Sequence, residues 1–449
     1  MKTPFYLYDT ALLARTLNAI QEETRGHDNF HVHYAIKANA NPTILRQIAA
    51  EGLGADCVSG GEIEAAMAAG FPAPKIVFAG VGKADWEIRL ALEKEIGMFN
   101  VESIEELQVI HDIATDMNKR ARVSFRINPD VGAHTHAHIT TGRAENKFGI
   151  DKEDMVKVIR MAQQMPLIDF TGLHFHIGSQ LLVMDDFEAL CLRINELQQE
   201  LEREGIYALN INVGGGLGID YEQPDEHPIP DFKAYFNVFK RGLQLRDGQQ
   251  LHFELGRAVV GQMGSLITQV LYVKHGKQKQ FVILDAGFTE LIRPAFYGAH
   301  HHIQNLTAQG LSLIPSLPSL PSQNTSPSTS PASGNTSPAT SLPTSPSISP
   351  TSENTSPATS PAAQSLSPAA QGLSPVTLGW CSAVSPQRSP SQTYDVVGPI
   401  CESSDTFARD VTLPETRRGD LIAIRSAGAY GEAMSSQYNC RPLPHSSFL

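Results

Sequence analysis

The stretch HVHYAIKANANP, residues 31–42, indicates the fold of this chain better than any other. Residues 31–37 have the pattern of a short β-strand, and the asparagines and proline that follow predict a loop and then a helix. Lys37 thus ends a predicted strand and projects its amine into a loop-lined mouth. In a parallel barrel this mouth carries the chemistry, and amines there are typical carriers of Schiff bases with carbonyl cofactors. Taken alone, Lys37 is more simply an ordinary solvated lysine, so the remaining sequence decides its meaning.

The run at residues 31–37 is the first of eight β-like runs that alternate with helical stretches. The runs are residues 31–37, 53–59, 75–80, 98–103, 122–127, 169–177, 210–216 and 251–257. Between them, segments such as Glu62–Ala69 and Asp186–Glu204 show the apolar spacing of amphipathic helices. This α/β rhythm predicts a (β/α)8 barrel over residues 26–262. A doubly wound open sheet is the alternative, because the number of strands alone does not exclude it.

Beyond residue 262 the β-like runs no longer alternate with long helices. These runs are residues 265–274, 280–285, 394–400 and 420–424. They predict a second, mostly-β barrel or sandwich domain built from residues 263–309 and 393–449. The N-terminal segment, residues 1–25, contains the β-like run Phe5–Asp9, which we expect to pair with this second domain.

Residues 310–392 interrupt the predicted β domain with a low-complexity sequence. They hold 15 of the 29 prolines, are otherwise mostly Ser, Thr, Ala and Asn, and carry only Glu353 and Arg388 as charged residues. Such a composition cannot bury enough apolar surface to offset the entropy lost on ordering. We therefore predict a disordered Ser/Pro-rich insertion, and favour an inert surface insertion over a binding or modification role.

The composition favours a mildly acidic protein without a polyanionic partner. The formal net charge is −12, which argues against nucleic acid or an anionic membrane. The sequence has no run of about 18 apolar residues, so no membrane span is predicted. MKTPFYLYDT at the N-terminus lacks a signal-peptide pattern, so we expect a cytoplasmic protein. The five cysteines are Cys57, Cys191, Cys381, Cys401 and Cys440. Their scatter, without a CxxC pair, predicts reduced thiols and no metal site.

Three of the predicted barrel strands end in residues that suit a phosphorylated, aromatic ligand. In HFHIGSQ, residues 174–180, an imidazole could stack on a flat ring and Ser179 could bond a phosphate, although metal ligation or core packing also fits two strand histidines. The glycines Gly214, Gly215 and Gly216 allow a phosphate to approach the backbone, or simply form a turn. Glu254 and Arg257 could serve a cationic ring nitrogen and an anion, or pair with each other.

The predicted β domain contributes further polar motifs. Arg293 could clamp a carboxylate, Glu402 could hold an ammonium group, and Cys401 could give or take a proton. Each of these residues is unremarkable alone, and a single cysteine is more often packing than an acid. Tyr297 and Tyr430 lie in the neighbouring motifs RPAFYGAHH and GAYGEAMSSQYN.

Seven ordered motifs resemble those of the diaminopimelate decarboxylases, the pyridoxal-phosphate enzymes of lysine biosynthesis in the alanine-racemase-like, fold-type III group. The motifs are YAIKAN, HFHIGSQ, the GGG loop, ELGR, RPAFYGAHH, GPICESSD and GAYGEAMSSQYN. GAHTHAHITTGRAENKFGI, residues 132–150, is also characteristic of this branch. The resemblance covers nearly the whole chain outside the insertion, and seven matches in order are highly specific.

The resemblance implies a role for each motif residue. Lys37 would anchor pyridoxal 5′-phosphate covalently, His176 would stack on its ring, and Glu254 would keep the ring nitrogen protonated. The other cofactor-binding residues would be Ser179, Gly214, Gly215, Gly216, Leu255, Gly256, Arg257 and Tyr430. The substrate-binding residues would be Arg257, Arg293, Tyr297, Glu402 and Tyr430. Cys401 would be the proton donor and would reach, with Glu402, from the partner subunit of a homodimer.

The implied reaction is the conversion of meso-2,6-diaminopimelate to L-lysine and carbon dioxide. The far amino-acid head of this substrate needs a cation for its carboxylate and an anion for its ammonium, which an arginine and Glu402 supply. A related basic amino-acid decarboxylase, acting on ornithine, arginine or carboxynorspermidine, is the alternative. A non-catalytic homologue is the other alternative, but the presence of both Lys37 and Cys401 argues against it.

Three departures from the family pattern qualify the resemblance. Leu255 stands where the family usually has Pro, from which we expect a small change in loop shape. The N-terminus is expected to lack residues common in the family. The C-terminus is expected to stop before the last strands of the second domain, which would leave an open sheet edge and weaken folding.

Overall fold

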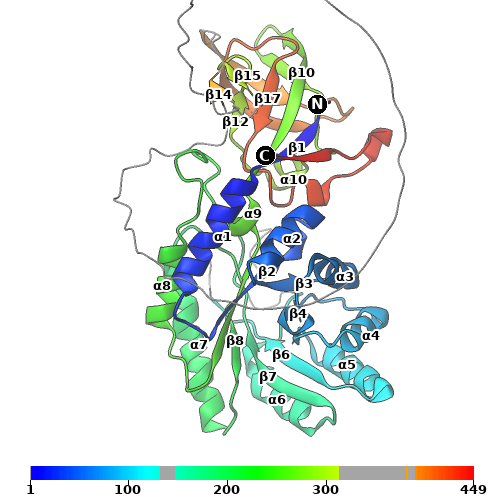
Figure 1. Ribbon diagram of the computed structural model, residues 1–449, viewed down its shortest axis with the longest axis vertical. Helices are drawn as coiled ribbons and strands as arrows, with labels where there is room; N and C mark the ends of the chain where they lie inside the picture. The colour runs from blue at the N-terminus through cyan, green and yellow to red at the C-terminus, as the bar shows by residue number, and fades with distance from the viewer. Residues whose placement is uncertain (1, 132–146, 313–380, 383–389) are drawn as a thin grey trace, which may run out of the picture. The chain divides into compact units, whose positions relative to one another are not determined.

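A closed parallel barrel occupies the first half of the chain in the computed structural model, which describes residues 2–131, 147–312, 381–382 and 390–449 (Figure 1). Its strands, within those residues, are β2 (Phe30–Ala35), β3 (Gly54–Cys57), β4 (Ile76–Phe78), β5 (Met98–Val101), β6 (Ala121–Arg126), β7 (Ile168–His174), β8 (Asn210–Asn212) and β9 (Gln250–Leu255). Each strand pairs in parallel with the next, and β9 pairs with β2 to close the ring. The predicted (β/α)8 barrel is confirmed, and the doubly wound sheet is excluded.

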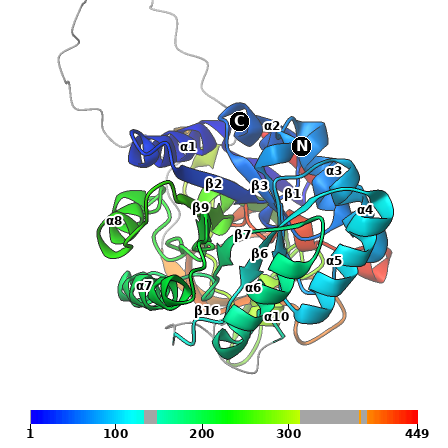
Figure 2. The ribbon, with the colours of Figure 1, turned by 90° about the horizontal axis from the view of Figure 1, so that it is seen from below.

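Helices surround the barrel strands (Figure 2). They are α1 (Thr10–Thr24), α2 (Pro42–Ala50), α3 (Gly60–Ala69), α4 (Asp85–Glu93), α5 (Ile104–Met117), α6 (Met155–Gln164), α7 (Asp185–Arg203) and α8 (Phe232–Gly242). Several begin at side-chain caps: Ser59 accepts from the amide of Glu62, and Ser103 accepts from that of Glu106. Each such cap stabilises the helix start by about 1 kcal/mol. Because these caps lie within two residues of a strand end, the strand-to-helix loops stay short and the strand ends stay open for function.

Aromatic packing fixes the last helix to the last strand. Tyr235, Phe236 and Phe239 of α8 are buried and meet the ring of Phe253 in β9 edge-on. Edge-to-face pairs of this kind add about 0.5–1.5 kcal/mol each beyond the burial of area. The cluster therefore supports β9, the strand whose C-terminal end carries Glu254.

The second domain is a mostly antiparallel sheet. Its strand order is β12 (Ile303–Asn305), β17 (Leu421–Ile424), β10 (Gly264–His275), β11 (Gln280–Leu284), β15 (Ser391–Val397) and β16 (Thr406–Pro414). β1 (Phe5–Tyr8) pairs with β10 and with β18 (His445–Phe448). This sheet confirms the predicted mostly-β second domain, and it packs with the barrel as one compact unit.

The predicted domain limits differ from the structure at both ends of the insertion. β13 (Leu311–Ser312) pairs with β14 (Cys381–Ser382), and β15 begins at Ser391, inside the predicted insertion. The polar residues at the start of β15 join the sheet through backbone pairing with β16, and their side chains alone do not indicate a strand. The rest of the predicted insertion, and residues 132–146 of the family motif, lie outside the described residues.

The N-terminal segment also divides between the two domains. β1 joins the sheet, whereas α1 packs beside α8 against the barrel. Leu13 and Leu17 of α1 are completely buried, so this apolar stripe explains why the helix follows the barrel. The strands β12, β13, β14, β16 and β18 were not predicted from the sequence; β18 (His445–Phe448), for example, contains no β-branched residue.

Several predicted strands end earlier than the sequence pattern indicates. β8 stops at Asn212 because Gly214 adopts a φ of 70°, which leaves the extended conformation. Lys37 lies beyond β2 in a short 3-10 turn, η1 (Ile36–Ala38), and not on the strand itself. The early strand ends turn the following residues inward, over the mouth of the barrel. No helix in the described part of the chain is both long and apolar enough to cross a membrane.

Neutral histidines are buried within the barrel wall at β2 and β9. Nδ1 of His33 lies 3.1 Å from the carbonyl oxygen of Lys75, and its Nε2 lies 2.9 Å from Nδ1 of His252, whose Nε2 lies 3.0 Å from Oδ1 of Asn210. Burial lowers the pKa of His33 to about 4 and lowers that of His252 well below its usual value. Burial therefore favours the neutral form of each ring near pH 7.

We predict that acidification weakens the fold through His33. Its folded pKa is lower than its unfolded pKa, so the unfolded chain binds more protons between pH 6.5 and 4, and stability falls as pH falls. His33 alone should remove about 2 kcal/mol between pH 7 and pH 5. A His33→Gln variant keeps a donor and an acceptor without titrating. Urea unfolding at both pH values should show a smaller loss for the variant, and equal losses would contradict the prediction.

Candidate active site

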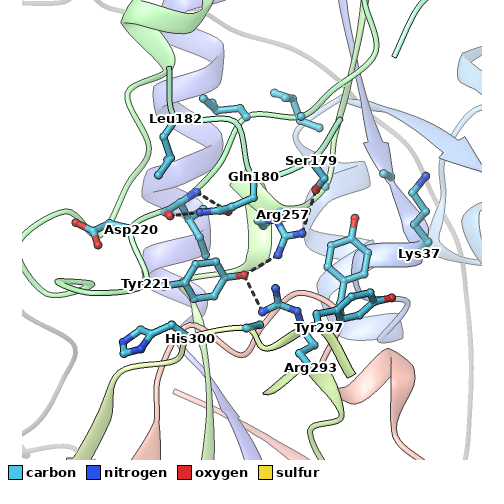
Figure 3. Close-up of a pocket in the computed structure, with 18 of the residues that line it drawn as sticks. Lys37, Ser179, Gln180, Leu182, Asp220, Tyr221, Arg257, Arg293, Tyr297 and His300 are labelled. Carbon is cyan, nitrogen blue, oxygen red and sulfur yellow. Dashed lines mark hydrogen bonds between the residues drawn. The ribbon is translucent and has the colours of Figure 1, made fainter. Parts of the chain in front are cut away.

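A cavity of about 920 Å³ lies over the C-terminal ends of the barrel strands and is bordered by the sheet domain. Predicted site residues on its wall are Lys37, His176, Ser179, Gly216, Glu254, Leu255, Gly256, Arg257, Arg293, Tyr297 and Tyr430. Figure 3 shows Lys37 at one side of this pocket, Asp220 and His300 at the other, and the guanidinium groups of Arg257 and Arg293 between them. A large cavity with converging polar groups at this face of a barrel is the expected place for catalysis.

The amine of Lys37 lies near acidic side chains in this cavity. Its side chain is accessible from the cavity that it lines, although protein groups surround it on the other sides. Burial lowers the pKa of Lys37, but the neighbouring acidic groups, Asp56 first, outweigh burial and raise the pKa above its ordinary value. The amine is therefore held as an ammonium group beside carboxylates until a ligand changes the balance.

Glu254 is a buried carboxylate held in its ionised form. Its Oε1 accepts from the side-chain amides of Asn100 at 2.9 Å and Asn212 at 2.7 Å, and its Oε2 accepts from Nε2 of His174 at 3.1 Å. Burial raises the pKa of Glu254, but His174, His176 and Asn212 together lower it far below its usual value. A carboxylate so stabilised suits a protonated ring nitrogen.

His176 is a neutral imidazole on the cavity wall. Its Nδ1 accepts from the amide of Gly215 at 3.4 Å. Burial and the cations Arg126 and Lys37 lower its pKa well below the usual value. A neutral ring in this place can lie against a flat aromatic ligand without carrying charge.

The three glycines after β8 have different tasks. The amides of Gly214 and Gly215 are used within the protein, by Oδ1 of Asn212 and Nδ1 of His176. Among these three, only Gly216 lines the cavity, where it adopts a φ of 106°. The predicted glycine cradle thus reduces to one residue at the cavity, and the other two permit close packing: a Cβ on Gly215 would lie 1.9 Å from the carbonyl oxygen of Glu254.

The two guanidinium groups are buried without a carboxylate. Arg257 donates to Oγ of Ser179 at 3.0 Å and to the hydroxyl of Tyr221 at 2.7 Å, and lies over the ring of Tyr430. Arg293 donates to the same Tyr221 hydroxyl at 2.9 Å. No salt bridge pairs either arginine with a carboxylate in the part of the chain that the structure describes, and Nε of Arg257 has no hydrogen-bond partner there. These groups are therefore available to anions.

Cys401 and Glu402 lie apart from this cavity. Both are exposed on the sheet domain, and Glu402 accepts from the hydroxyl of Tyr438 at 2.6 Å. Glu402 lines a different hollow, of about 560 Å³, on the sheet domain. Within one chain, the structure therefore does not bring the predicted proton donor to Lys37.

Four functional neighbours were not predicted from the sequence. They are Asp56, Asn100, His174 and Tyr221, of which Asp56 and Tyr221 line the cavity. Asp56 and Asn100 sit within short apolar strands, GADC and MFNV, where a lone polar residue in a fully buried strand is the available signal. Oδ1 of Asp56 has no hydrogen-bond partner among the described residues. Burial raises the pKa of Asp56 well above its usual value.

The cavity fits pyridoxal phosphate on four counts. It offers an amine for the aldehyde, an ionised carboxylate for a protonated ring nitrogen, a neutral imidazole for the ring face, and an unsatisfied buried Arg257 Nε for a phosphate. Ser179, Gly216 and Gly256 lie on the same wall as Arg257 and could share the phosphate. The donor set therefore suits this cofactor.

An amine, a carboxylate, an imidazole and an arginine at the mouth of a barrel that is followed by a sheet domain are typical of the pyridoxal-dependent decarboxylases. The pyridoxal binding domain of that class matches residues 11–261, and its C-terminal sheet domain matches residues 363–428. The chain belongs, within this class, to the diaminopimelate decarboxylase family. The diaminopimelate decarboxylase of Bacteroides thetaiotaomicron is 52% identical over 444 residues, which cover 99% of this chain and 95% of that protein.

Solved structures agree with this assignment. The crystal structure of diaminopimelate decarboxylase from Helicobacter pylori complexed with L-lysine has a TM-score of 0.77 at 35% identity, covering 100% of this chain and 92% of that one. The lysine/ornithine decarboxylase of Vibrio vulnificus, complexed with putrescine, has a TM-score of 0.70 at 18% identity, covering 100% and 94%. The second likeness shows a shared fold alone.

We predict that Gly215→Ala damages the site by displacing the end of β9. The added methyl would meet the carbonyl oxygen of Glu254, so we expect a loss of about 1–3 kcal/mol in stability and weaker retention of pyridoxal phosphate. Gly61→Ala in α3 is the matched control, because the nearest atom to the added methyl would be Oγ of Ser59 at 3.9 Å, and it should stabilise the protein by about 0.5–1 kcal/mol. Urea unfolding and the absorbance of bound cofactor measure both effects. Equal behaviour of the two variants would refute the steric argument.

Proposed function

We propose that this protein decarboxylates meso-2,6-diaminopimelate to L-lysine, the last step of lysine biosynthesis, with pyridoxal phosphate bound at Lys37. The observation that carries the proposal is the pair of buried, carboxylate-free guanidinium groups of Arg257 and Arg293 in the cavity of Lys37 and Glu254. A doubly zwitterionic substrate needs such free cations. The names of the relatives above support the same reaction.

The barrel residues hold the cofactor in the proposed site. Pyridoxal phosphate, when bound, supplies a sink for the electron pair that remains after a carboxylate leaves as carbon dioxide. Lys37 is its covalent attachment point, and Glu254 keeps a proton on the ring nitrogen, which strengthens the sink. His176 covers a ring face. The phosphate is assigned to cavity residues from both domains: Ser179, Gly216, Leu255, Gly256, Arg257 and Tyr430.

The sheet-domain residues hold the substrate. Arg293 and Tyr297, from helix α10 (Arg293–Tyr297), line the cavity beside Arg257 and Tyr430. A guanidinium group binds a carboxylate through charge-assisted hydrogen bonds that are about twice as strong as neutral ones. Glu402 is assigned to the ammonium group of the far amino-acid head. A diamine precursor such as ornithine would have no second carboxylate for Arg293.

The proton donor is assigned to Cys401 of the partner subunit in a homodimer. Support comes from its position: Cys401 and Glu402 are exposed together on one loop, outside their own cavity. In an isologous dimer the same loop can enter the facing cavity of each subunit in turn. Cys57, Cys191, Cys401 and Cys440 are free thiols, which fits the reducing cytoplasm that we propose as the location of this protein.

The direct test is turnover by the purified protein with added pyridoxal phosphate. We expect release of L-lysine and carbon dioxide from meso-diaminopimelate and negligible release of diamines from ornithine or arginine. Lys37→Ala should lose both turnover and the cofactor that borohydride traps on the wild type, because it removes the attachment point. Diamine release without lysine release would favour the related decarboxylases instead.

A mixing experiment tests the shared site. Lys37→Ala and Cys401→Ala should each be nearly inactive alone, since one loses the cofactor anchor and the other the proton donor. After co-expression, a hybrid dimer carries both defects in one cavity and none in the other, so about a quarter of wild-type activity should return. A mixture that stays inactive would place Cys401 in its own cavity, whereas an active Cys401→Ala protein alone would place Cys401 outside the reaction.

A further inference from the structure

One phenol oxygen lies between the two arginines of the cavity. The hydroxyl of Tyr221 accepts from Nη1 of Arg257 at 2.7 Å and from Nη1 of Arg293 at 2.9 Å. Figure 3 shows both guanidinium groups directed at this oxygen from opposite domains. The two cationic nitrogens are thus less than two hydrogen-bond lengths apart. The ring of Tyr221 also lies against both guanidinium groups.

The group between the two arginines is a hydrogen-bond acceptor without a negative charge. Two buried guanidinium groups repel each other, and a carboxylate between them would remove the repulsion. It would also neutralise the charge that an incoming anion needs. A phenol satisfies one donor of each arginine and leaves both positive charges in place.

His301 holds the second arginine by the same principle. Its Nδ1–H donates to the carbonyl of Arg425 at 2.8 Å, so its Nε2 must accept from Nη1 of Arg293 at 2.8 Å. Burial and the charge of Arg293 lower the pKa of His301 to about 3, which keeps the ring neutral. Arg293 is therefore fixed between two neutral acceptors, one on each domain.

The loop that carries Tyr221 is fastened to the sheet domain. Asp225, four residues further along, forms a bidentate ion pair with Arg425 at 2.7 and 3.2 Å. Tyr221 is buried, with 9% of its surface exposed, and meets the ring of His301 edge-on. These contacts hold the hydroxyl in one position between the two arginines.

We propose that Tyr221 is a positioning residue for the substrate carboxylate, acting by holding Arg257 and Arg293 apart in a fixed geometry without neutralising them. The inference rests on the proposed function and deepens it, because it names the group that keeps the carboxylate-binding arginines charged and aimed. Tyr221 itself need not touch the substrate. Its loss should weaken substrate capture more than the chemical step.

The test is the kinetics of Tyr221→Phe in the holoenzyme. We expect KM for meso-diaminopimelate to rise about tenfold or more, because each of the two arginines loses a charge-assisted hydrogen bond, with kcat within about threefold of the wild type. Tyr235→Phe is the matched control, since its hydroxyl is buried without a partner among the described residues and lies outside the cavity. Its KM should not change. A KM for Tyr221→Phe within twofold of the wild type would overturn the inference.

A double-mutant cycle shows whether Tyr221 acts through Arg293. Arg293→Lys should raise KM by itself, and adding Tyr221→Phe to that background should raise KM by a smaller factor than it does in the wild type, because only the hydrogen bond to Arg257 remains to be lost. Fully additive effects would overturn the inference, because they would mean that Tyr221 acts independently of Arg293. The cycle compares variants that share the same cavity, so a general loss of stability would appear in the melting temperatures instead.

A probe without turnover separates this inference from the proposed function. Glutarate, a dicarboxylate without amino groups, should raise the melting temperature of the wild-type holoenzyme and of Tyr235→Phe, but much less that of Tyr221→Phe. Wild-type protein that binds glutarate without releasing lysine would refute the function and leave the positioning role standing. Wild-type turnover, together with an equal rise in melting temperature with glutarate in all three proteins, would refute the positioning role and leave the proposed function standing.

Discussion

The pairing of β9 with β2 is the constraint on which the site depends. This ladder sets His33 opposite Glu254 and Tyr34 opposite Leu255, and so closes the barrel. The turn after β2 and the residues after β9 then leave the ring at adjacent points. Lys37 and the Glu254–Arg257 segment, more than 200 residues apart in sequence, share one wall for this reason. A slip of one residue in this ladder would exchange inward and outward side chains along β2 or β9 and dismantle the site.

The sheet domain completes the site because it is tied to the same turn. The amide of Tyr430 donates to the carbonyl of Ala38 at 2.8 Å, and the side chain of Asn39 donates to the carbonyl of Gly428 at 2.9 Å. These bonds join the residues beside Lys37 to the segment that carries Tyr430. Arg293 is tied in turn to the barrel through Tyr221. The lysine and the arginines therefore belong to one connected framework of hydrogen bonds across two domains.

Much of this arrangement could be predicted from the sequence, for physical reasons. Eight alternating strand–helix units close into a barrel, and a barrel gathers its strand ends, so Lys37, His176, Glu254 and Arg257 had to meet. Asp56 and Asn100 were missed, because which residue of a short buried strand faces inward depends on register. The glycine motif was predicted as a phosphate cradle, but the amides of Gly214 and Gly215 serve Asn212 and His176. Tyr221 was missed because its task arises only when two domains place their arginines on either side of it.

The division of the cavity between two domains has a consequence for how such a protein can change. The residues assigned to the cofactor's ring and attachment lie on the barrel, whereas Arg293 and Tyr297 lie on one short helix of the sheet domain. Substitutions in α10 and the segments beside it can therefore change which substrate binds, while the residues assigned to the cofactor stay the same. Selection for a new substrate and selection for a working cofactor act on separate stretches of the gene. Arg257 and Tyr221 are the exceptions, barrel residues that any such change of substrate must accommodate.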